Sequence, residues 1–142
     1  MHLGAMIDVG VESEYLLGEL QKLGLDEYEI EIETVQKKGI TATKVNVKDK
    51  SHNSHHPHGS RTFSDISELI ENSGISDSAK TLSIHMFTRL AESEAKIHGT
   101  TIDEIHFHEV GAVDSIVDIV GSAVCLDKLD PDRILCSPVQ VG

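Results

Sequence analysis

Hydrophobic and polar positions change their spacing several times along this chain, and each spacing predicts a different element. Apolar residues first recur at helical intervals, which predicts two short helices over residues 1–9 and 12–23, the second ended by Gly24. The period then becomes two, because Ile and Tyr alternate with Glu. Residues 28–34 and 40–47, joined by a Lys-Lys-Gly turn, therefore predict an antiparallel β-hairpin with one polar face.

The second half of the chain returns to helical spacing. Thr62 and Asp65 form a capping-box pattern before one helix, and Ser76 is placed to cap a longer helix that runs to about His98, where Gly99 ends it. We expect the longer helix to bury one face, which is made up of Ala79, Leu82, Met86, Leu90 and Ile97.

The last third contains the most hydrophobic segment. Thr101 and Glu104 indicate a short helical turn, and the residues after it are expected to be extended up to Gly111. Residues 112–129 are apolar almost all round, which predicts a central buried helix, and residues 133–136 are predicted to form a strand. The fold class is therefore α/β (α+β), a small sheet that includes the hairpin, with helices packed on it.

Composition narrows the functional classes. The chain has 142 residues and a net charge of −12 with neutral histidine, which argues against nucleic acid or an anionic membrane as a partner. The only cysteines, Cys125 and Cys136, form no CxxC pair and lie in apolar sequence, so we expect two buried free thiols. This cysteine usage is typical of a reduced protein and predicts a cytoplasmic location.

Both ends of the chain have the sequence of internal segments. It starts directly in helical sequence without a capping residue, and it closes on Ser-Pro-Val-Gln-Val-Gly, which is typical of a strand leading into a loop. We therefore expect residues 1–142 to form a single N-terminal domain of a longer protein. Composition leaves its oligomeric state open, a homo-oligomer included.

The candidate chemistry is concentrated at the start of the predicted buried helix. Two imidazoles and three carboxylates lie within thirteen residues, and these are His106, His108, Glu109, Asp114 and Asp118. In an extended segment the two histidines point the same way, and two acids four apart on a helix share a face. Such a donor set suits a borderline divalent metal such as Zn, Ni or Fe.

A structural interpretation of the same residues stays open. Asp114 belongs to the first turn of a helix, where a carboxylate is favoured by the helix dipole. His106 could pair with Glu104 or Glu109, and Asp118 could be solvated.

A second group of candidate ligands lies in the polar segment at residues 49–60, which is expected to be a mobile loop. It holds four of the nine histidines, namely His52, His55, His56 and His58. Short histidine-rich tracts bind metals through neutral imidazole, and a flexible one would capture or deliver a metal rather than catalyse a reaction. The alternative is a plain polar linker.

The sequence from His106 to Gly121, HFHEVGAVDSIVDIVG, closely resembles the signature of the LarC family, the nickel-insertion proteins of nickel-pincer cofactor synthesis. Other segments agree along the whole chain. Residues 3–11 resemble the family's first helix, residues 37–45 its hairpin, and residues 52–58 its histidine-rich insertion. Residues 136–138 resemble the strand that follows the signature helix.

The resemblance implies a nickel chelatase or lyase that inserts Ni(II) into pyridinium-3,5-bisthiocarboxylic acid mononucleotide in a CTP-dependent reaction. CTP and its divalent metal belong to the family's C-terminal domain, which would be a partner of this one, and we expect this segment alone to be inactive. The implied metal ligands are His52, His55, His56, His58, His106 and His108. Glu109, Asp114 and Asp118 are implied either to form a rigid site with His106 and His108, for nickel or for the mononucleotide, or to act as catalytic bases that take the pyridinium ring proton. A non-catalytic nickel-binding or metallochaperone module and a structural domain remain as alternatives.

Overall fold

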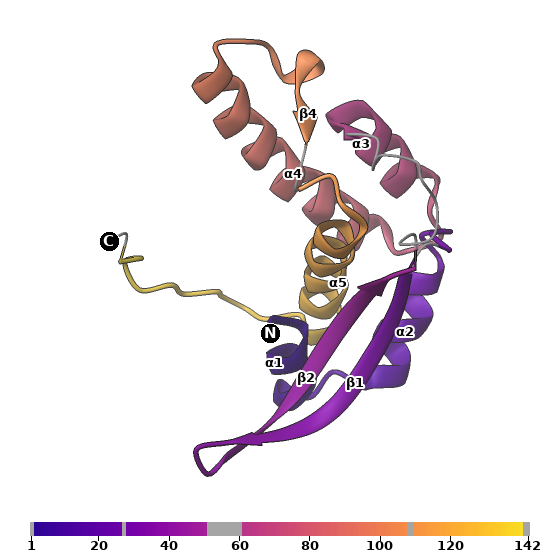
Figure 1. Cartoon of the computed structure of the whole chain (residues 1–142), viewed down its shortest axis with the longest axis vertical. Coiled ribbons are helices and arrows are strands. Elements are labelled where there is room, and N and C mark those ends of the chain that lie inside the picture. The colour runs from indigo at the N-terminus through magenta and orange to yellow at the C-terminus, as the bar shows by residue number, and fades with distance from the viewer. Residues whose placement is uncertain (1, 27, 51–60, 108–109, 141–142) are drawn as a thin grey trace.

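The computed structural model of the chain describes residues 2–26, 28–50, 61–107 and 110–140 (Figure 1). Its first half contains helices α1 (His2–Val9) and α2 (Ser13–Gln21), followed by strands β1 (Tyr28–Lys37) and β2 (Ile40–Asp49). Its second half contains β3 (Arg61–Thr62), α3 (Phe63–Asn72), α4 (Asp77–His98), the short 3-10 helix η2 (Ile102–Glu104), β4 (His106–Phe107) and α5 (Val113–Leu129). The expected mixed α/β class is confirmed.

The predicted hairpin is confirmed and is longer than expected, because pairing continues up to the turn. β1 and β2 pair over their full lengths in antiparallel register, ending with Lys37 opposite Ile40. Lys38 and Gly39 form the turn with φ of +52° and +81°. Two successive positive φ values are typical of the two-residue turns whose twist matches that of the strands.

Alternation along the strands gives the hairpin two different faces. One face carries Ile30, Ile32, Val45 and Val47, which belong to the hydrophobic core or pack against it. The other face is a row of exposed glutamates and lysines, which form the ion pairs Glu33–Lys44, Glu31–Lys48 and Glu29–Lys50. Because solvent screens exposed pairs, we expect this row to contribute solubility more than stability.

Helix α1 lies directly against β2. A Cβ atom on Gly4 would lie 2.1 Å from the carbonyl oxygen of Thr43, so only glycine permits this approach. The Asp8 carboxylate accepts hydrogen bonds from the Thr43 backbone N–H at 3.0 Å and from Thr43 Oγ1 at 2.7 Å. These bonds lower the pKa of Asp8 from its ordinary value of 3.8.

Replacing Thr43 by valine is expected to raise the pKa of Asp8 towards 3.8, because the hydroxyl bond is the largest cause of the lowering. A carboxyl with a depressed folded-state pKa stabilises the fold above its unfolded-state pKa, and this contribution disappears as pH falls through the folded-state value. The variant should therefore lose less stability than the wild type over that acid range. Carboxyl-detected NMR titration and acid unfolding would measure both effects, with the exposed Thr41→Val as the control.

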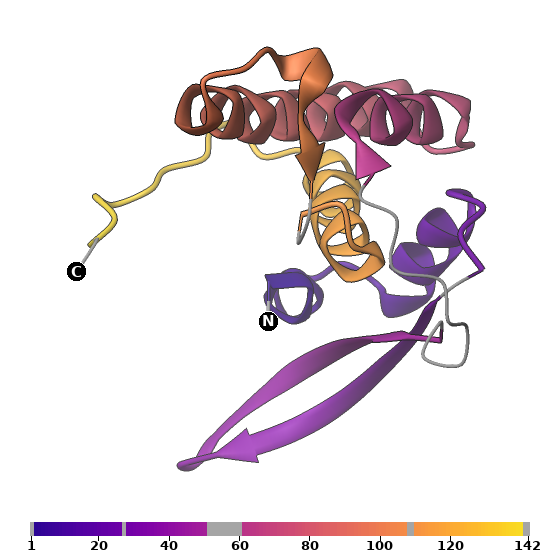
Figure 2. The same ribbon diagram turned by 45° about the horizontal axis from the view of Figure 1, so that its top comes forward.

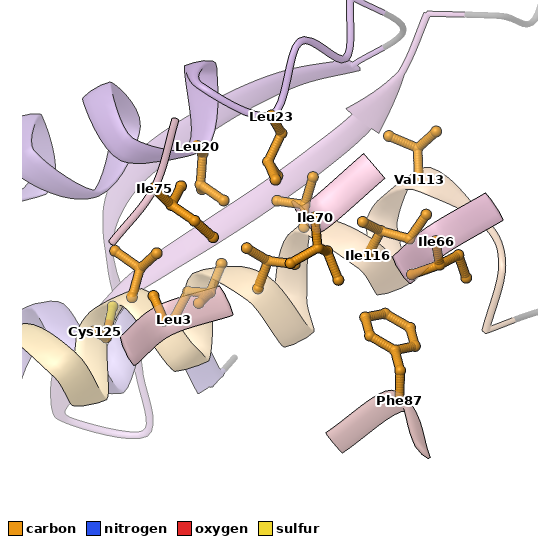
Figure 3. Packing of buried hydrophobic residues seen from close by; sticks show 14 of the residues in the cluster. Leu3, Leu20, Leu23, Ile66, Ile70, Ile75, Phe87, Val113, Ile116 and Cys125 are labelled. Atoms are coloured by element: carbon orange, nitrogen blue, oxygen red, sulfur yellow. The ribbon is translucent and has the colours of Figure 1, made fainter. Parts of the chain in front are cut away.

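The chain is layered, as Figures 1 and 2 show, with the hairpin on one side, α4 on the other, and α1, α2 and α5 between them. Helix α5 contacts α1, α2, α4 and β2. Nine of its residues are buried, from Val113 to Cys125, so the predicted central buried helix is confirmed. Figure 3 shows Val113, Ile116 and Cys125 of α5 among the core side chains contributed by other elements.

The predicted caps of α3 and α4 are confirmed, but the buried face of α4 differs from the expected one. Thr62 and Asp65 form the capping box, Ser76 caps α4, and Gly99 ends it with φ of +67°. The residues buried on α4 are Ala79, Ser83, Phe87, Ala91 and Ala95. Leu82, Met86 and Leu90 are only half-buried, and Ile97 is 78% exposed.

The physical reason for this difference is the helix that packs against α4. Four of the five buried residues are small, and they recur every four positions, so they form a shallow row against which α5 can approach closely. Hydrophobicity alone predicted that the larger side chains Leu82, Met86 and Leu90 would be buried, but in the structure they are only half-buried.

The predicted strand at residues 133–136 is wrong. Residues 131–140 form no strand, and in Figures 1 and 2 this segment projects away from the helices. Ile134 and Leu135 are 65% and 76% exposed, because none of the strands in the described ranges pairs with this segment or covers it. Cys136 is exposed for the same reason, so only Cys125 is the expected buried thiol.

No helix in the part of the chain that the structure describes has both the length and the apolar character needed to cross a membrane.

Candidate functional site

A second, two-stranded sheet brings together segments that are far apart in the sequence. β3 and β4 pair antiparallel, with Arg61 opposite Phe107 and Thr62 opposite His106. Residues 51–60, with His52, His55, His56 and His58, lie outside the described residues, but they precede Arg61 directly in the chain. The sheet therefore joins the end of the histidine-rich segment to the start of the signature.

Alternation along β4 separates an exposed imidazole from a buried ring. Phe107 is 2% exposed, and its ring centroid lies 6.2 Å from that of Phe87 on α4, with 57° between the ring planes. Such a tilted pair is a favourable arrangement of aromatic rings. The neighbouring His106 is exposed, so β4 anchors itself through Phe107 and presents His106 to solvent.

The capping box of α3 holds the strand opposite His106. Asp65 Oδ2 accepts the Thr62 backbone N–H at 2.8 Å, and Thr62 Oγ1 accepts the Asp65 backbone N–H at 3.1 Å. The bonds to Thr62 lower the pKa of Asp65, and the nearby charges of His106 and Arg61 lower it further. An ionised carboxylate therefore lies within electrostatic reach of the imidazole.

Gly111 lies close to the end of β4. Arg61 Nη1 donates a hydrogen bond to the Gly111 carbonyl oxygen at 3.0 Å. A Cβ on Gly111 would lie 2.7 Å from the Phe107 carbonyl oxygen and 3.1 Å from Phe107 Cβ. Glycine is thus required at this position, because any side chain would push residue 111 away from Phe107.

The described candidate residues are solvent-facing. His106, Asp114 and Asp118 are all exposed, and the two aspartates lie four positions apart on α5, as expected. Although their neighbours in the sequence are mostly apolar, these three side chains are exposed and so carry no large desolvation cost. His108 and Glu109 lie outside the described residues.

The structure does not assemble these residues into a metal centre. Within the described ranges, no group of three or more His, Cys, Asp or Glu side chains is placed to hold a metal ion. The Glu104 carboxylate, one expected partner of His106, accepts hydrogen bonds from Thr100 Oγ1 and the Thr101 backbone N–H. These bonds lower the pKa of Glu104.

Sequence reasoning missed Arg61 and the carboxylate of Asp65 as neighbours of the signature. The capping-box pattern identified Asp65 only as the start of a helix. For Arg61 the only signal was its position immediately after the histidine-rich segment. Neither residue is linked to His106 by any local spacing.

Two histidines on α4 and the buried thiol of Cys125 also carry atoms that bind metals, but they lie outside the signature. His85 is exposed on α4, and His98 Nε2 lies 3.4 Å from Glu94 Oε2 one turn earlier in the same helix. Burial raises the pKa of the Cys125 thiol to about 11, which disfavours the reactive thiolate.

The fold and these groups define a mixed α/β domain that exposes candidate ligands for a borderline divalent metal beside a two-stranded sheet. The chain belongs to the nickel insertion protein family, whose sequence model matches residues 1–142.

Three relatives illustrate the similarity. Each is named a pyridinium-3,5-bisthiocarboxylic acid mononucleotide nickel insertion protein. The relative from Clostridium kluyveri is 51% identical over 150 residues, covering 100% of this chain and 38% of the relative. Those from Clostridium acetobutylicum and Akkermansia muciniphila are 47% and 46% identical, covering 100% of this chain and 41% and 36% of the relatives. The chain thus spans about two fifths of their length. No solved structure matches it.

Proposed function

We propose that this chain is the nickel-handling part of a protein that inserts Ni(II) into pyridinium-3,5-bisthiocarboxylic acid mononucleotide. The observation that carries this proposal is the family match over residues 1–142, together with relatives of that name that align with the whole chain. The net charge of −12 supports it, because an acidic surface attracts divalent cations. The cytoplasmic location stays a prediction.

The proposed nickel ligands are His106 and His108, with His52, His55, His56 and His58 capturing the ion. Imidazole suits nickel, and the sulfur atoms of the mononucleotide are softer ligands that can take the ion over. The exposure of His106 supports this role, because a ligand that passes nickel to a nucleotide-sized substrate must be accessible.

The proposed bases are Glu109, Asp114 and Asp118. When the carbon–nickel bond forms, the ring carbon gives its C–H electron pair to nickel, and the proton leaves to a carboxylate. Asp114 and Asp118 are exposed on the first two turns of α5, so a substrate can reach both carboxylates. A protein that carries out this reaction is a nickel chelatase or lyase.

The acidic cavity between α2 and β1 does not suit CTP. The cavity of about 540 Å³ between α2 and β1 is lined by Asp26 and Glu29, with Lys50 as its one basic residue. Two carboxylates repel a triphosphate, so we derive no step through CTP and assign it to the remainder of the protein.

The test is a calorimetric nickel titration of the chain. We expect His106→Ala and His108→Ala each to weaken binding about tenfold or more, as loss of a ligand typically does. The exposed His85→Ala is the matched control and should bind like the wild type. Replacing the four histidines of residues 52–58 by serine should slow nickel uptake while leaving the tight site intact.

Two outcomes would redirect the proposal. Loss of binding only in the loop variant would favour a metallochaperone module, and absence of binding in the wild type would contradict nickel handling by this chain. Insertion is tested in the complete protein with CTP and the mononucleotide, with mass spectrometry of the product. Full activity in Asp114→Asn would exclude that carboxylate as the base.

A further inference from the structure

Arg61 contacts both Phe107 at the end of β4 and Gly111 shortly before α5. Its backbone pairs with Phe107, and its guanidinium donates a hydrogen bond to the carbonyl oxygen of Gly111. The backbone nitrogen of Arg61 also lies 3.4 Å from the position that a Gly111 Cβ would occupy. Arg61 thus contacts the last residue of β4 and a residue two positions before α5.

We propose that Arg61 is a positioning residue for the nickel site, because it ties β4, which carries the proposed ligand His106, to Gly111, which lies just before α5. This inference rests on the proposed function and adds a residue to the same site. Arg61 does not itself bind the metal, because a guanidinium has no acceptor atom and stays protonated.

Several contacts limit how far Arg61 and its partners can move. Thr62, the next residue, is bound within the capping box of α3, and Phe107 is buried against Phe87. The backbone of Arg61 is therefore held in place, and the hydrogen bond from its guanidinium restricts the position of Gly111. Ligand groups must be held within about 0.5 Å of their productive geometry to bind a metal well, so this support matters.

The charge near the site is also balanced. A guanidinium close to a bound Ni²⁺ is repulsive unless an anion compensates it, and the Asp65 carboxylate is such an anion. Its pKa is lowered mainly by its bonds to Thr62 and further by the charge of Arg61. This arrangement lets a cation stay near the proposed ligands. The acidic residue in the first turn of α3, Asp65, thus lies four positions after Arg61.

The test compares Arg61→Met with Arg61→Lys in nickel titrations of the whole chain. We expect Arg61→Met to weaken nickel binding about 10-fold or more, the usual effect of removing a group that orients a ligand. Arg61→Lys keeps a cationic donor and should recover most of that loss. Arg89→Met is the matched control, because Arg89 is an exposed α4 arginine whose ion partner is Glu92, and it should bind like the wild type.

A spectroscopic readout separates positioning from general stability. At saturating Ni²⁺ the absorption spectrum of the bound ion should change in Arg61→Met, because its ligands are rearranged, whereas a variant that is only less stable keeps the wild-type spectrum. If Arg61→Met does not fold, Arg61→Gln takes its place, since its amide is too short to reach Gly111. Wild-type affinity and spectrum in these variants would overturn the inference alone. A wild-type chain that binds no nickel would overturn the proposed function and the inference together.

Discussion

Replacing Gly4 by alanine is expected to lower the free energy of unfolding by about 3 kcal/mol or more, the upper part of the range for an overpacked interior. The added Cβ would lie 2.1 Å from the Thr43 carbonyl oxygen and 3.0 Å from its carbonyl carbon. Both are backbone atoms in the middle of β2, so no rotamer change can relieve the overlap. Helix α1 would have to move away from the hairpin, which would loosen the bonds of Asp8 and the burial of Leu3.

Urea denaturation followed by circular dichroism measures this change. The matched control is Gly18→Ala, because Gly18 is exposed on α2 and a Cβ there meets no atom within 4 Å. That substitution should stabilise the chain by roughly 0.5–1 kcal/mol, the usual difference between alanine and glycine within a helix. Equal stability of the Gly4 and Gly18 variants would contradict the close packing of α1 on β2.

Replacing Phe87 by alanine is expected to cost about 3–5 kcal/mol of unfolding free energy, the usual penalty for removing a buried phenyl ring. Phe87 is fully buried, and Figure 3 shows its ring directed into the core. It is also the aromatic partner of Phe107, so its loss leaves a cavity beside β4. Hydrogen exchange of the β3–β4 backbone amides should increase together with the loss of stability.

The control for Phe87 lies on the same helix. Ile97 is 78% exposed, so Ile97→Ala should change the unfolding free energy by less than about 0.5 kcal/mol. The more conservative substitution Phe87→Leu should cost less than the alanine variant because it leaves a smaller cavity. If the Ile97 and Phe87 alanine variants were equally stable, the burial of the α4 face that carries Phe87 would be contradicted.

Local patterns predicted most of the fold correctly. The alternation from Tyr28, the capping box at Thr62 and the cap at Ser76 each depend on residues a few positions apart, so they are visible without tertiary structure. Residues 112–129 are apolar on nearly all sides of the helix, and this local pattern correctly predicted that α5 is central and buried. The strand expected near Arg133 failed, because a strand needs a partner, and the neighbouring sequence does not indicate whether one exists.

Prediction of the site went less far. The signature residues were identified from the sequence, and His106, Asp114 and Asp118 lie on the surface, where a substrate can reach them. Their neighbours in the sequence are mostly apolar and buried, but on a helix and a strand neighbouring residues face different directions, so the polar side chains can still face solvent.

By itself, the sequence determined the identities of the elements, their caps and the membership of the nickel insertion protein family. Helical and strand periods, caps and signatures are all short-range relations along the chain. Only the tertiary structure decided which face of α4 is buried, that β3 pairs with β4, and that Arg61 holds Gly111. These contacts join residues distant in sequence, and they are selected by the packing of α3, α4 and α5 around a common core rather than by any local spacing.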